Sequence, residues 1–398
     1  MIGILLLLFA VKANCAPCEV ALQREALEKF YLATNGGSWL HSSGWLNDSL
    51  PCSSGPSHCC WEGVTCCTSA LCPVGAEDEI SCNCTPGLVV ALKLDHNNLE
   101  GNLPDSVAAS CELRSIDLDS NELGGAGLPE TIQELGELTF LFLGKNRLTG
   151  ELGDSLRGLT KLQALDLSGN HLEGSFPFQS LCGDPGGTSL DTLLIADNLF
   201  SGSIDLTSCR ELMILDMPGN MFEGTLPDLR MNKKLHYLCM KSNGFSGSIP
   251  PSLSSSELLF IVDLSHNQLE GRLEDLRLQE KRLLRVLRLD GNRLTGRLTT
   301  SWLTVPDLNL SSNRLTGSLP SDSVAYAHLS SRSHIVDLRQ NLLSCCGTGL
   351  QDAAVYSEAP PQDQLSVVYQ SVDYSAPRLP SYLLFDSVLS DPDADGLQ

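Results

Sequence analysis

Five aspartates recur at one position of a repeated frame, each between two apolar residues. They are Asp117, Asp166, Asp216, Asp263 and Asp337. If the frames are stacked strands about 4.8 Å apart, alternate repeats place carboxylates about 10 Å apart. Such a pair resembles the acid and base of a glycoside hydrolase. Catalysis, however, needs two groups in different environments, and we expect a repeated column to offer similar ones. We therefore expect no enzyme and no cofactor.

Cysteines are the second group that could carry chemistry, and nine of them crowd the region before the repeated frame. They are Cys18, Cys52, Cys59, Cys60, Cys66, Cys67, Cys72, Cys82 and Cys84. This density is typical of disulfides in an oxidising compartment. Paired cysteines also bind zinc, but adjacent Cys-Cys pairs are poorly spaced for four ligands, and only His41 and His58 are near. We expect disulfides and no metal.

A third candidate lies at the end of the chain. Asp391, Asp393 and Asp395, followed by Gly396, match the first half of a calcium-binding loop. The sequence stops at Gln398, before the glutamate that usually completes such a loop. We favour an acidic tail over a calcium site.

The frame that carries the aspartates is L-x-L-x-x-N-x-L-x-G. Its asparagines are Asn97, Asn121, Asn146, Asn170, Asn198, Asn220, Asn243, Asn267, Asn292, Asn313 and Asn341. These eleven copies have a mean step of about 24 residues, within the range of leucine-rich repeats. In each copy the leucines face one side of a short strand and the x residues face the other. One unit cannot bury its leucines alone, so the frame predicts a stacked α/β repeat solenoid.

Local residues refine this prediction. The asparagines should satisfy backbone groups at the bend, in a ladder along the stack. A second short strand should follow each N-x-L-x-G, and it should be weaker at Gly150, Gly271 and Gly296, where the consensus fails. Residues 20–33 have helical periodicity through Leu22, Ala26, Leu27, Phe30 and Tyr31, and should cover the open end of the first repeat.

The ending Gly-x-Leu/Ile-Pro, as in Gly224-Thr225-Leu226-Pro227, and the cap Tyr31-x-x-Thr34-x-Gly36-Gly37-x-Trp39 carry a family resemblance. The chain resembles plant-type leucine-rich-repeat proteins, such as receptor-like-kinase outer domains and polygalacturonase inhibitors. The cap resembles the variety found in algae and other microbial eukaryotes. The resemblance implies a right-handed superhelix of about eleven repeats with a cysteine-rich N-terminal cap. It also implies a cap disulfide between Cys59 and Cys66.

We divide the chain into four segments. Residues 1–16 have the apolar run and small residues of a secretory signal peptide. Residues 17–87 form the cysteine-rich cap, residues 88–346 the solenoid, and residues 347–398 an acidic tail that we expect to be partly disordered. No apolar run is long enough for a transmembrane segment. The net charge of −22 argues against nucleic-acid binding.

Outward residues that depart from the repeat consensus are the natural ligand contacts. The proposed ligand-binding residues are Phe140, Phe142, Asp166, Asp216, Tyr237, Cys239, Lys241, Asp263 and Arg288. We expect the aspartates among them to be mostly repeat consensus, and the aromatic pair to be contact surface. Cys239 is either an exposed free thiol or a small buried apolar side chain.

Three sequons predict glycans at Asn47, Asn83 and Asn309. A glycan at Asn309, in the outward column of repeat ten, would confine a binding patch to repeats two to nine. Cys182 and Cys209 occupy related places in adjacent repeats, and we hypothesise a disulfide between them. The glycine-rich insert at 182–188 should leave the strand register intact.

These observations favour a secreted or cell-surface, non-catalytic recognition protein. Its ligand would be a peptide, a protein or a glycan, bound on the concave face of the solenoid. Inhibition of an extracellular hydrolase, a truncated receptor-like-kinase ectodomain and a structural wall or matrix protein are alternatives. The oligomeric state is not set by the sequence.

Overall fold

The computed structural model describes residues 19–47, 49, 51–53, 55–69, 80, 81, 83–183, 189–318 and 335–344. All of them belong to one compact unit, Met1–Val355. The predicted signal peptide, the Cys345-Cys346 pair and the acidic tail with its half calcium loop lie outside the described residues.

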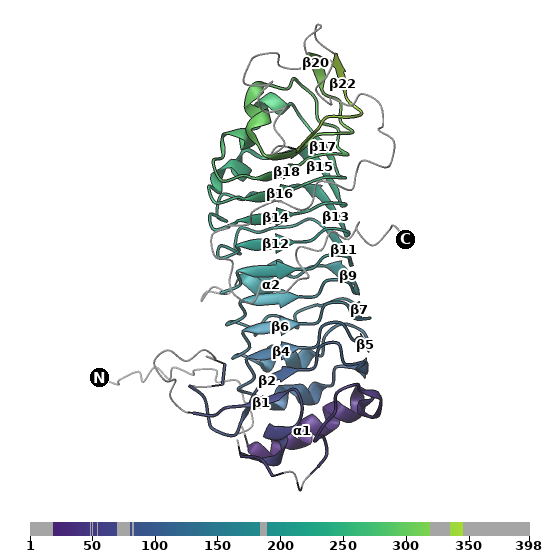
Figure 1. Ribbon diagram of the computed structural model, residues 1–398, viewed down its shortest axis with the longest axis vertical. Helices are drawn as coiled ribbons and strands as arrows, with labels where there is room; N and C mark the ends of the chain where they lie inside the picture. Colours follow the sequence, from purple (N-terminus) through teal and green to yellow (C-terminus); the bar gives the residue numbers. More distant parts are fainter. Residues whose placement is uncertain are drawn as a thin grey trace, which may run out of the picture. The chain divides into compact units, whose positions relative to one another are not determined.

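Eleven strands, one from each predicted repeat, form a parallel sheet in chain order (Figure 1). They are β2 (Val89–Lys93), β4 (Ser115–Asp117), β6 (Phe140–Phe142), β8 (Ala164–Asp166), β10 (Thr192–Leu194), β12 (Ile214–Asp216), β14 (Tyr237–Cys239), β16 (Ile261–Asp263), β18 (Val286–Arg288), β19 (Asp307–Asn309) and β21 (Ile335–Asp337). A twelfth strand, β1 (Val64–Cys66), pairs antiparallel with β2 at the cap. Strand β10 stays in register with both neighbours, so the insert does not shift the sheet, as predicted.

The consensus residues hold the stack together. The inward leucines are fully buried, as Leu165, Leu193 and Leu215 illustrate. The predicted asparagine ladder is present. Asn121 Nδ2 donates to the carbonyls of Leu94 and Leu118, both at 2.9 Å, and its Oδ1 accepts from the backbone N–H of Leu99. Each asparagine therefore satisfies backbone groups of two repeats at a bend where no strand ladder is available.

A second set of strands follows the bend, on the side marked by β5 to β15 in Figure 1. Six of them form one parallel sheet: β7 (Thr149–Gly150), β9 (His171–Ser175), β11 (Leu199–Gly202), β13 (Met221–Thr225), β15 (Gly244–Ser248) and β17 (Gln268–Glu270). Two separate pairs flank it, β3 (Glu100–Asn102) with β5 (Glu122–Gly124), and β20 (Thr316–Ser318) with β22 (Leu342–Ser344). Strand β7 has two residues, and Thr295 keeps only an isolated bridge to Arg272. The predicted weakening is confirmed at Gly150 and Gly296, whereas β17, just before Gly271, keeps three residues paired with β15.

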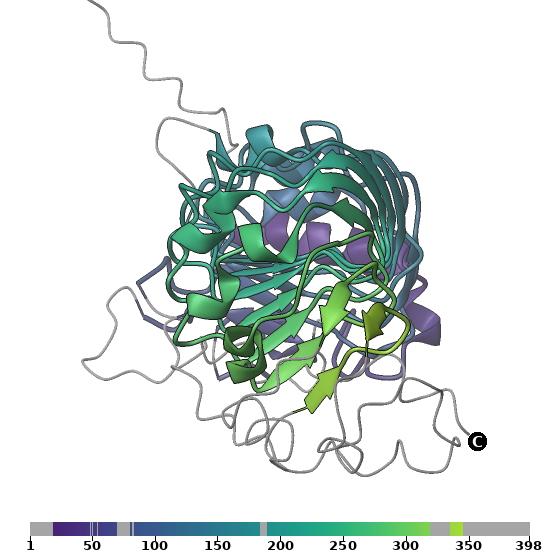
Figure 2. The same cartoon turned by 90° about the horizontal axis from the view of Figure 1, so that it is seen from above.

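Short helical turns complete several of the coils and non-helical turns complete the others, so that sheets and turns enclose the core when viewed along the stack (Figure 2). They are η3 (Asp105–Ala109), η4 (Glu130–Glu134), α2 (Phe178–Cys182), η5 (Pro251–Ser255), η6 (Leu273–Asp275), η7 (Leu278–Glu280) and η8 (Thr300–Thr304). The disulfide between Cys182 and Cys209 joins adjacent repeats here, which confirms the hypothesis. Asn232 Nδ2 continues the connection by donating to the carbonyls of Leu206 and Cys209.

The cap contains α1 (Val20–Ala33), η1 (Gly36–Ser38) and η2 (Ser57–Cys60), and α1 lies at the first-repeat end of the stack (Figure 1). Phe30, Trp39, Trp45 and Trp61 are buried against one another. One prediction is wrong, because Leu22 is exposed.

Gln23 takes the buried place instead of Leu22. Gln23 is buried because of a hydrogen bond rather than because of apolar packing. Gln23 Oε1 accepts the N–H of Val89 at 2.7 Å, a donor at the open end that an apolar side chain would leave unsatisfied.

Disulfides tie the cap to itself. Cys59 pairs with Cys66, as the family resemblance implied. Cys52 pairs with Cys60, and Cys67 with Cys84. Within each adjacent Cys-Cys pair, the two cysteines therefore form disulfides with different partners.

Candidate functional site

The outward residues of the long parallel sheet form two columns, which we call the strand face. The first column, from β4 to β18, is Ser115, Phe140, Ala164, Thr192, Ile214, Tyr237, Ile261 and Val286. The second is Asp117, Phe142, Asp166, Leu194, Asp216, Cys239, Asp263 and Arg288. Strand pairing keeps each column in register, so that Asp166, Leu194 and Asp216 follow one another on neighbouring strands. The predicted ligand-binding residues all belong to this face except Lys241, which lies just beyond β14.

The centre of the strand face is a cluster of three polar side chains from two neighbouring strands. Tyr237 Oη donates to Asp216 Oδ1 at 3.3 Å, and the Cys239 thiol also hydrogen-bonds to Asp216. Burial raises the pKa of Tyr237 and of Cys239 well above their ordinary values, and the Asp216 charge adds to both shifts. Tyrosine and cysteine are therefore neutral donors here. Sequence reasoning named all three residues but did not pair them, although the register of adjacent repeats would have done so.

Cys239 is the free cysteine among the described residues, and it is 5% exposed. Of the two alternatives that the sequence left open for Cys239, the structure therefore supports the small buried side chain. Strand β14 lies between β12 and β16, so Cys239 is packed between Asp216 and Asp263 of its neighbours. A buried thiol with a raised pKa is a poor nucleophile, since the thiolate is the reactive form.

The aspartate column is similar, as expected, in the direction of the pKa shifts at Asp117, Asp166 and Asp216, and it differs in the hydrogen-bond partners of Asp216. Burial raises the pKa of Asp216 to about 7, and the charges of Asp166 and Asp197 add to the shift. The pKa of Asp166 is raised to about 6 by burial, although hydrogen bonds from Ser168 oppose the shift. Burial, with the Asp95 charge, raises the pKa of Asp117 to about 6.

Asp263 is held as Asp166 is. Ser265 donates to Asp263 Oδ1 from the backbone N–H at 2.9 Å and from Oγ at 2.6 Å. Ser168 donates to Asp166 Oδ1 from the same two groups at 2.8 and 2.6 Å.

Asp216 differs from both, because it accepts hydrogen bonds from Tyr237 and Cys239 instead. Even so, burial shifts the pKa values of Asp166 and Asp216 in the same direction. A catalytic acid and its base require surroundings that shift their two pKa values apart.

The carboxylates of the strand face fall into two groups, those without an ion-pair partner and those with one. None of Asp117, Asp166, Asp216 and Asp263 forms an ion pair within the described ranges. Further along the sheet, Arg288 pairs with Asp307 at 3.6 Å, and Arg339 binds Asp337 through Nη2 at 2.5 Å. The Arg288 side chain, a predicted ligand contact, therefore has an internal carboxylate partner.

Aromatic residues mark the start of the face. Phe140 and Phe142 are half-buried, and their rings stack at 6.1 Å between centroids with an angle of 29°. The alternation of β6 puts both on the outward side, as predicted. They lie one strand from Asp117 and one strand from Asp166.

The three sequons occupy different surroundings. Asn47 and Asn83 are exposed and belong to the cap, away from the strand face. Asn309 is half-buried on β19, and its Oδ1 accepts the N–H of Ser311 at 3.1 Å.

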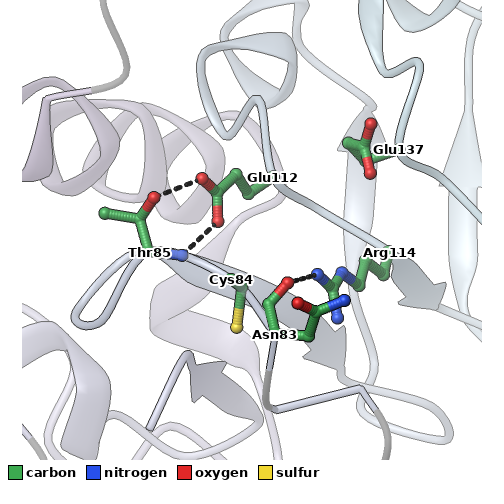
Figure 3. Close-up of a pocket in the computed structure, with 6 residues that line it drawn as sticks. All are labelled: Asn83, Cys84, Thr85, Glu112, Arg114 and Glu137. Carbon is green, nitrogen blue, oxygen red and sulfur yellow. Dashed lines mark hydrogen bonds between the residues drawn. The ribbon is translucent and has the colours of Figure 1, made fainter. Parts of the chain in front are cut away.

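A cavity of about 400 Å³ lies beside Asn83, where the cap meets repeats two and three (Figure 3). Its polar groups already have partners. Glu112 accepts from the backbone N–H and hydroxyl of Thr85, at 2.7 and 2.6 Å, and Arg114 Nη2 donates to the Asn83 carbonyl at 2.6 Å. Glu137, drawn at the upper edge of Figure 3, pairs with Lys161. We interpret this region as a joint between cap and solenoid.

The described residues bring together one group with metal-ligand atoms, His58, Cys59 and Cys66. Its two sulfurs are joined in a disulfide, so the thiolates that zinc requires are not available. No helix in the described ranges has the length and apolar character needed to cross a membrane.

Comparisons with known proteins agree with this architecture. Leucine-rich-repeat family models match residues 111–172 and 234–256. No curated protein matches the chain. Among solved structures, the ectodomain of the Arabidopsis thaliana receptor kinase GASSHO1/SCHENGEN3, in complex with Casparian strip integrity factor 2, is 34% identical with a TM-score of 0.57. The match covers 64% of this chain and 30% of that ectodomain, so the chain spans under a third of that relative.

Two further structures are similar. The Arabidopsis receptor kinase HAESA, in complex with the peptide hormone IDA and the co-receptor SERK1, is 25% identical with a TM-score of 0.51, over 81% of this chain and 58% of that one. A plant ice-binding protein is 23% identical with a TM-score of 0.62, over 82% and 96% respectively. The repeats, the stacked parallel sheet and these matches together identify the chain as a plant-type leucine-rich-repeat protein.

Proposed function

We propose that the protein is a non-catalytic recognition protein of the cell exterior that binds a peptide on the strand face. The observation that carries this proposal is the pairing of two unlike columns. Tyr237 and Ile261 are half-buried, largely apolar side chains of the first column, in which Thr192 and Ile214 are buried, and the second column beside them carries carboxylates without ion-pair partners. A surface with apolar and charged contacts side by side suits a peptide, which offers both kinds of side chain.

Two further facts support the proposal. The receptor structure that resembles this chain at 25% identity is a complex with the peptide hormone IDA, and the one at 34% identity is a complex with Casparian strip integrity factor 2. The cap and repeats contain four fully described disulfides, which suit an oxidising, extracellular setting. Hydrolase inhibition and a wall-structural role have no comparable feature on the strand face to recommend them.

Selection from a random peptide display library tests this function. Purified protein should enrich a defined set of sequences. Tyr237→Ala should abolish that enrichment, whereas Leu199→Ala, at an exposed leucine of the second sheet, should preserve it. Enrichment that survives Tyr237→Ala would move the binding site elsewhere, and no enrichment from any library would refute peptide recognition.

A further inference from the structure

The carboxylates of the second column recur on every second strand. Asp117, Asp166, Asp216 and Asp263 lie on β4, β8, β12 and β16. The strands between them, β6, β10 and β14, place Phe142, Leu194 and Cys239 at the same position. Seven consecutive strands therefore alternate a carboxylate with an uncharged, largely apolar side chain.

This alternation has a definite length. Neighbouring strands are about 4.8 Å apart, so the carboxylates recur about every 9.6 Å along the stack. Three steps, from Asp117 to Asp263, cover about 29 Å. A ligand that binds all four carboxylates must repeat its complementary group at this interval, so that the mismatch in position stays small over three steps.

Peptide conformations differ in how well they meet that interval. Polyproline II advances about 3.1 Å per residue, so every third residue recurs at about 9.3 Å and three steps cover about 28 Å. An extended strand repeats a side chain on one face at about 6.6 Å, far from the required spacing. An α-helix repeats at about 10.5 Å per heptad, which overshoots by about 3 Å over three steps. Polyproline II is the regular conformation that stays in register.

Charge selects the ligand group. The four carboxylates have no ion-pair partner among the described residues. Around Asp216 the facing charged or titratable groups are Asp166, Asp197, Tyr237 and Cys239, which include no cation. Around Asp166 they are Asp119 and Lys145, and around Asp117 they are Lys93, Asp95 and Asp119. Asp263 faces Asp290 and Asp307, and it lies in register with Arg288, whose guanidinium pairs with Asp307. The complementary partner for half-buried carboxylates is a guanidinium or ammonium group.

We propose that the strand face binds an extended polyproline II peptide that lies along the stack and carries a cationic side chain at every third residue. This rests on the peptide-binding function proposed above. The cationic groups bind Asp117, Asp166, Asp216 and Asp263 in turn. The residues between them pack on Phe142, and on Tyr237 and Ile261 of the neighbouring column, which are half-buried.

Burial supports a pH dependence of the same site. Because the pKa values of Asp117, Asp166 and Asp216 are raised to between about 6 and about 7, part of the row is protonated below neutrality. A bound cation favours the ionised form. Peptide affinity therefore increases as the pH rises from 5.5 to 8.

The test compares three fluorescent twelve-residue peptides of equal composition, four arginines and eight prolines, by anisotropy at pH 8. One repeats Arg-Pro-Pro, one groups the four arginines at one end, and one spaces them irregularly. The Arg-Pro-Pro repeat should bind at least about 10-fold more tightly than either of the others. Equal affinities would overturn the proposal, since charge alone would then explain binding.

Variants locate the contact. The quadruple change of Asp117, Asp166, Asp216 and Asp263 to asparagine keeps side-chain shape and should weaken the Arg-Pro-Pro peptide about 100-fold. The matched control, Asp307→Asn with Asp337→Asn, should change it less than about 2-fold, since those carboxylates already have arginine partners. Melting curves exclude unfolding, and Asp216→Asn alone should lower affinity without loss of fold. An unchanged affinity in the quadruple variant would overturn the proposal.

Other outcomes separate this inference from the broader function. Display-selected neutral or acidic peptides that lose binding in Tyr237→Ala would uphold peptide recognition and refute the cationic spacing. Binding of chitosan oligomers with no binding of any peptide would refute both, and would indicate a glycan ligand.

Discussion

Repeats two to eight and repeats nine to eleven differ in whether the carboxylates of the strand face have ion-pair partners. In the first group Asp166 and Asp216 have no ion-pair partner within the described residues, and burial raises their pKa values. In the second group Arg339 binds Asp337 at 2.5 Å, and Arg288 lies 3.6 Å from Asp307. Fold and register are the same in both. The repeat frame therefore does not determine what a carboxylate does; its neighbours on adjacent strands determine it.

Charge reversal should give the largest separation between the two groups. Asp216→Lys places a cation in the middle of the carboxylate row and should weaken the Arg-Pro-Pro peptide about 30-fold. Asp337→Lys, at the paired end, should weaken it less than about 3-fold. Anisotropy titrations of both variants at pH 8 make the measurement. Equal losses of affinity in the two variants would show that both groups of repeats act alike and that only net charge determines binding.

Replacing an aspartate by asparagine should change the free energy of unfolding with opposite sign in the two groups of repeats. The raised pKa of Asp216 means that the folded state binds a proton more tightly than the unfolded chain. Ionisation of Asp216 therefore destabilises the fold as the pH rises from about 4 to about 7. Asp216→Asn removes this cost and should raise the free energy of unfolding by about 2 kcal/mol at pH 8, with little effect at pH 4.

Asp337→Asn provides the contrast, since it removes one partner of a half-exposed ion pair with Arg339. It should lower the free energy of unfolding by about 0.5 kcal/mol at pH 8. Denaturant melts of both variants at pH 4 and pH 8 provide the comparison. A destabilised Asp216→Asn protein at pH 8 would mean that the carboxylate is stabilised by contacts that the structure does not contain.

The pH dependence of binding should be smaller still. Between pH 5.5 and pH 8 the affinity for the Arg-Pro-Pro peptide should rise about 10-fold. In Asp216→Asn the rise should shrink, because the group whose pKa is about 7 is gone. Anisotropy across this range, at fixed ionic strength, gives the curve. A wild-type curve that is flat would contradict the assignment of these carboxylates to the contact.

Sequence patterns predicted the frame of this protein well and its site only in part. Leucine and asparagine positions keep a fixed spacing within each repeat, so eleven strands and the ladder at Asn121 could be predicted from spacing alone. The outward column was also located correctly. Its environments were not, because they depend on contacts between repeats, such as Tyr237 with Asp216, and on side chains beside the strand, such as Ser265 with Asp263.

The cap also shows what sequence periodicity cannot predict. Periodicity assigned Leu22 to the buried face of α1, but the open end of β2 needs a hydrogen-bond acceptor, and Gln23 supplies it. Apolar patterns predict which surface is covered. They do not predict which backbone donors remain unsatisfied beneath it.

Carboxyl ¹³C NMR titration of the wild-type protein, with Asp216→Asn to assign the signal, tests most directly whether the central row is left unneutralised. The Asp216 carboxyl should titrate with a pKa of about 7 in the free protein, and its pKa should fall when the Arg-Pro-Pro peptide is bound. An ordinary aspartate pKa in the free protein, or one that the peptide does not lower, would contradict the account.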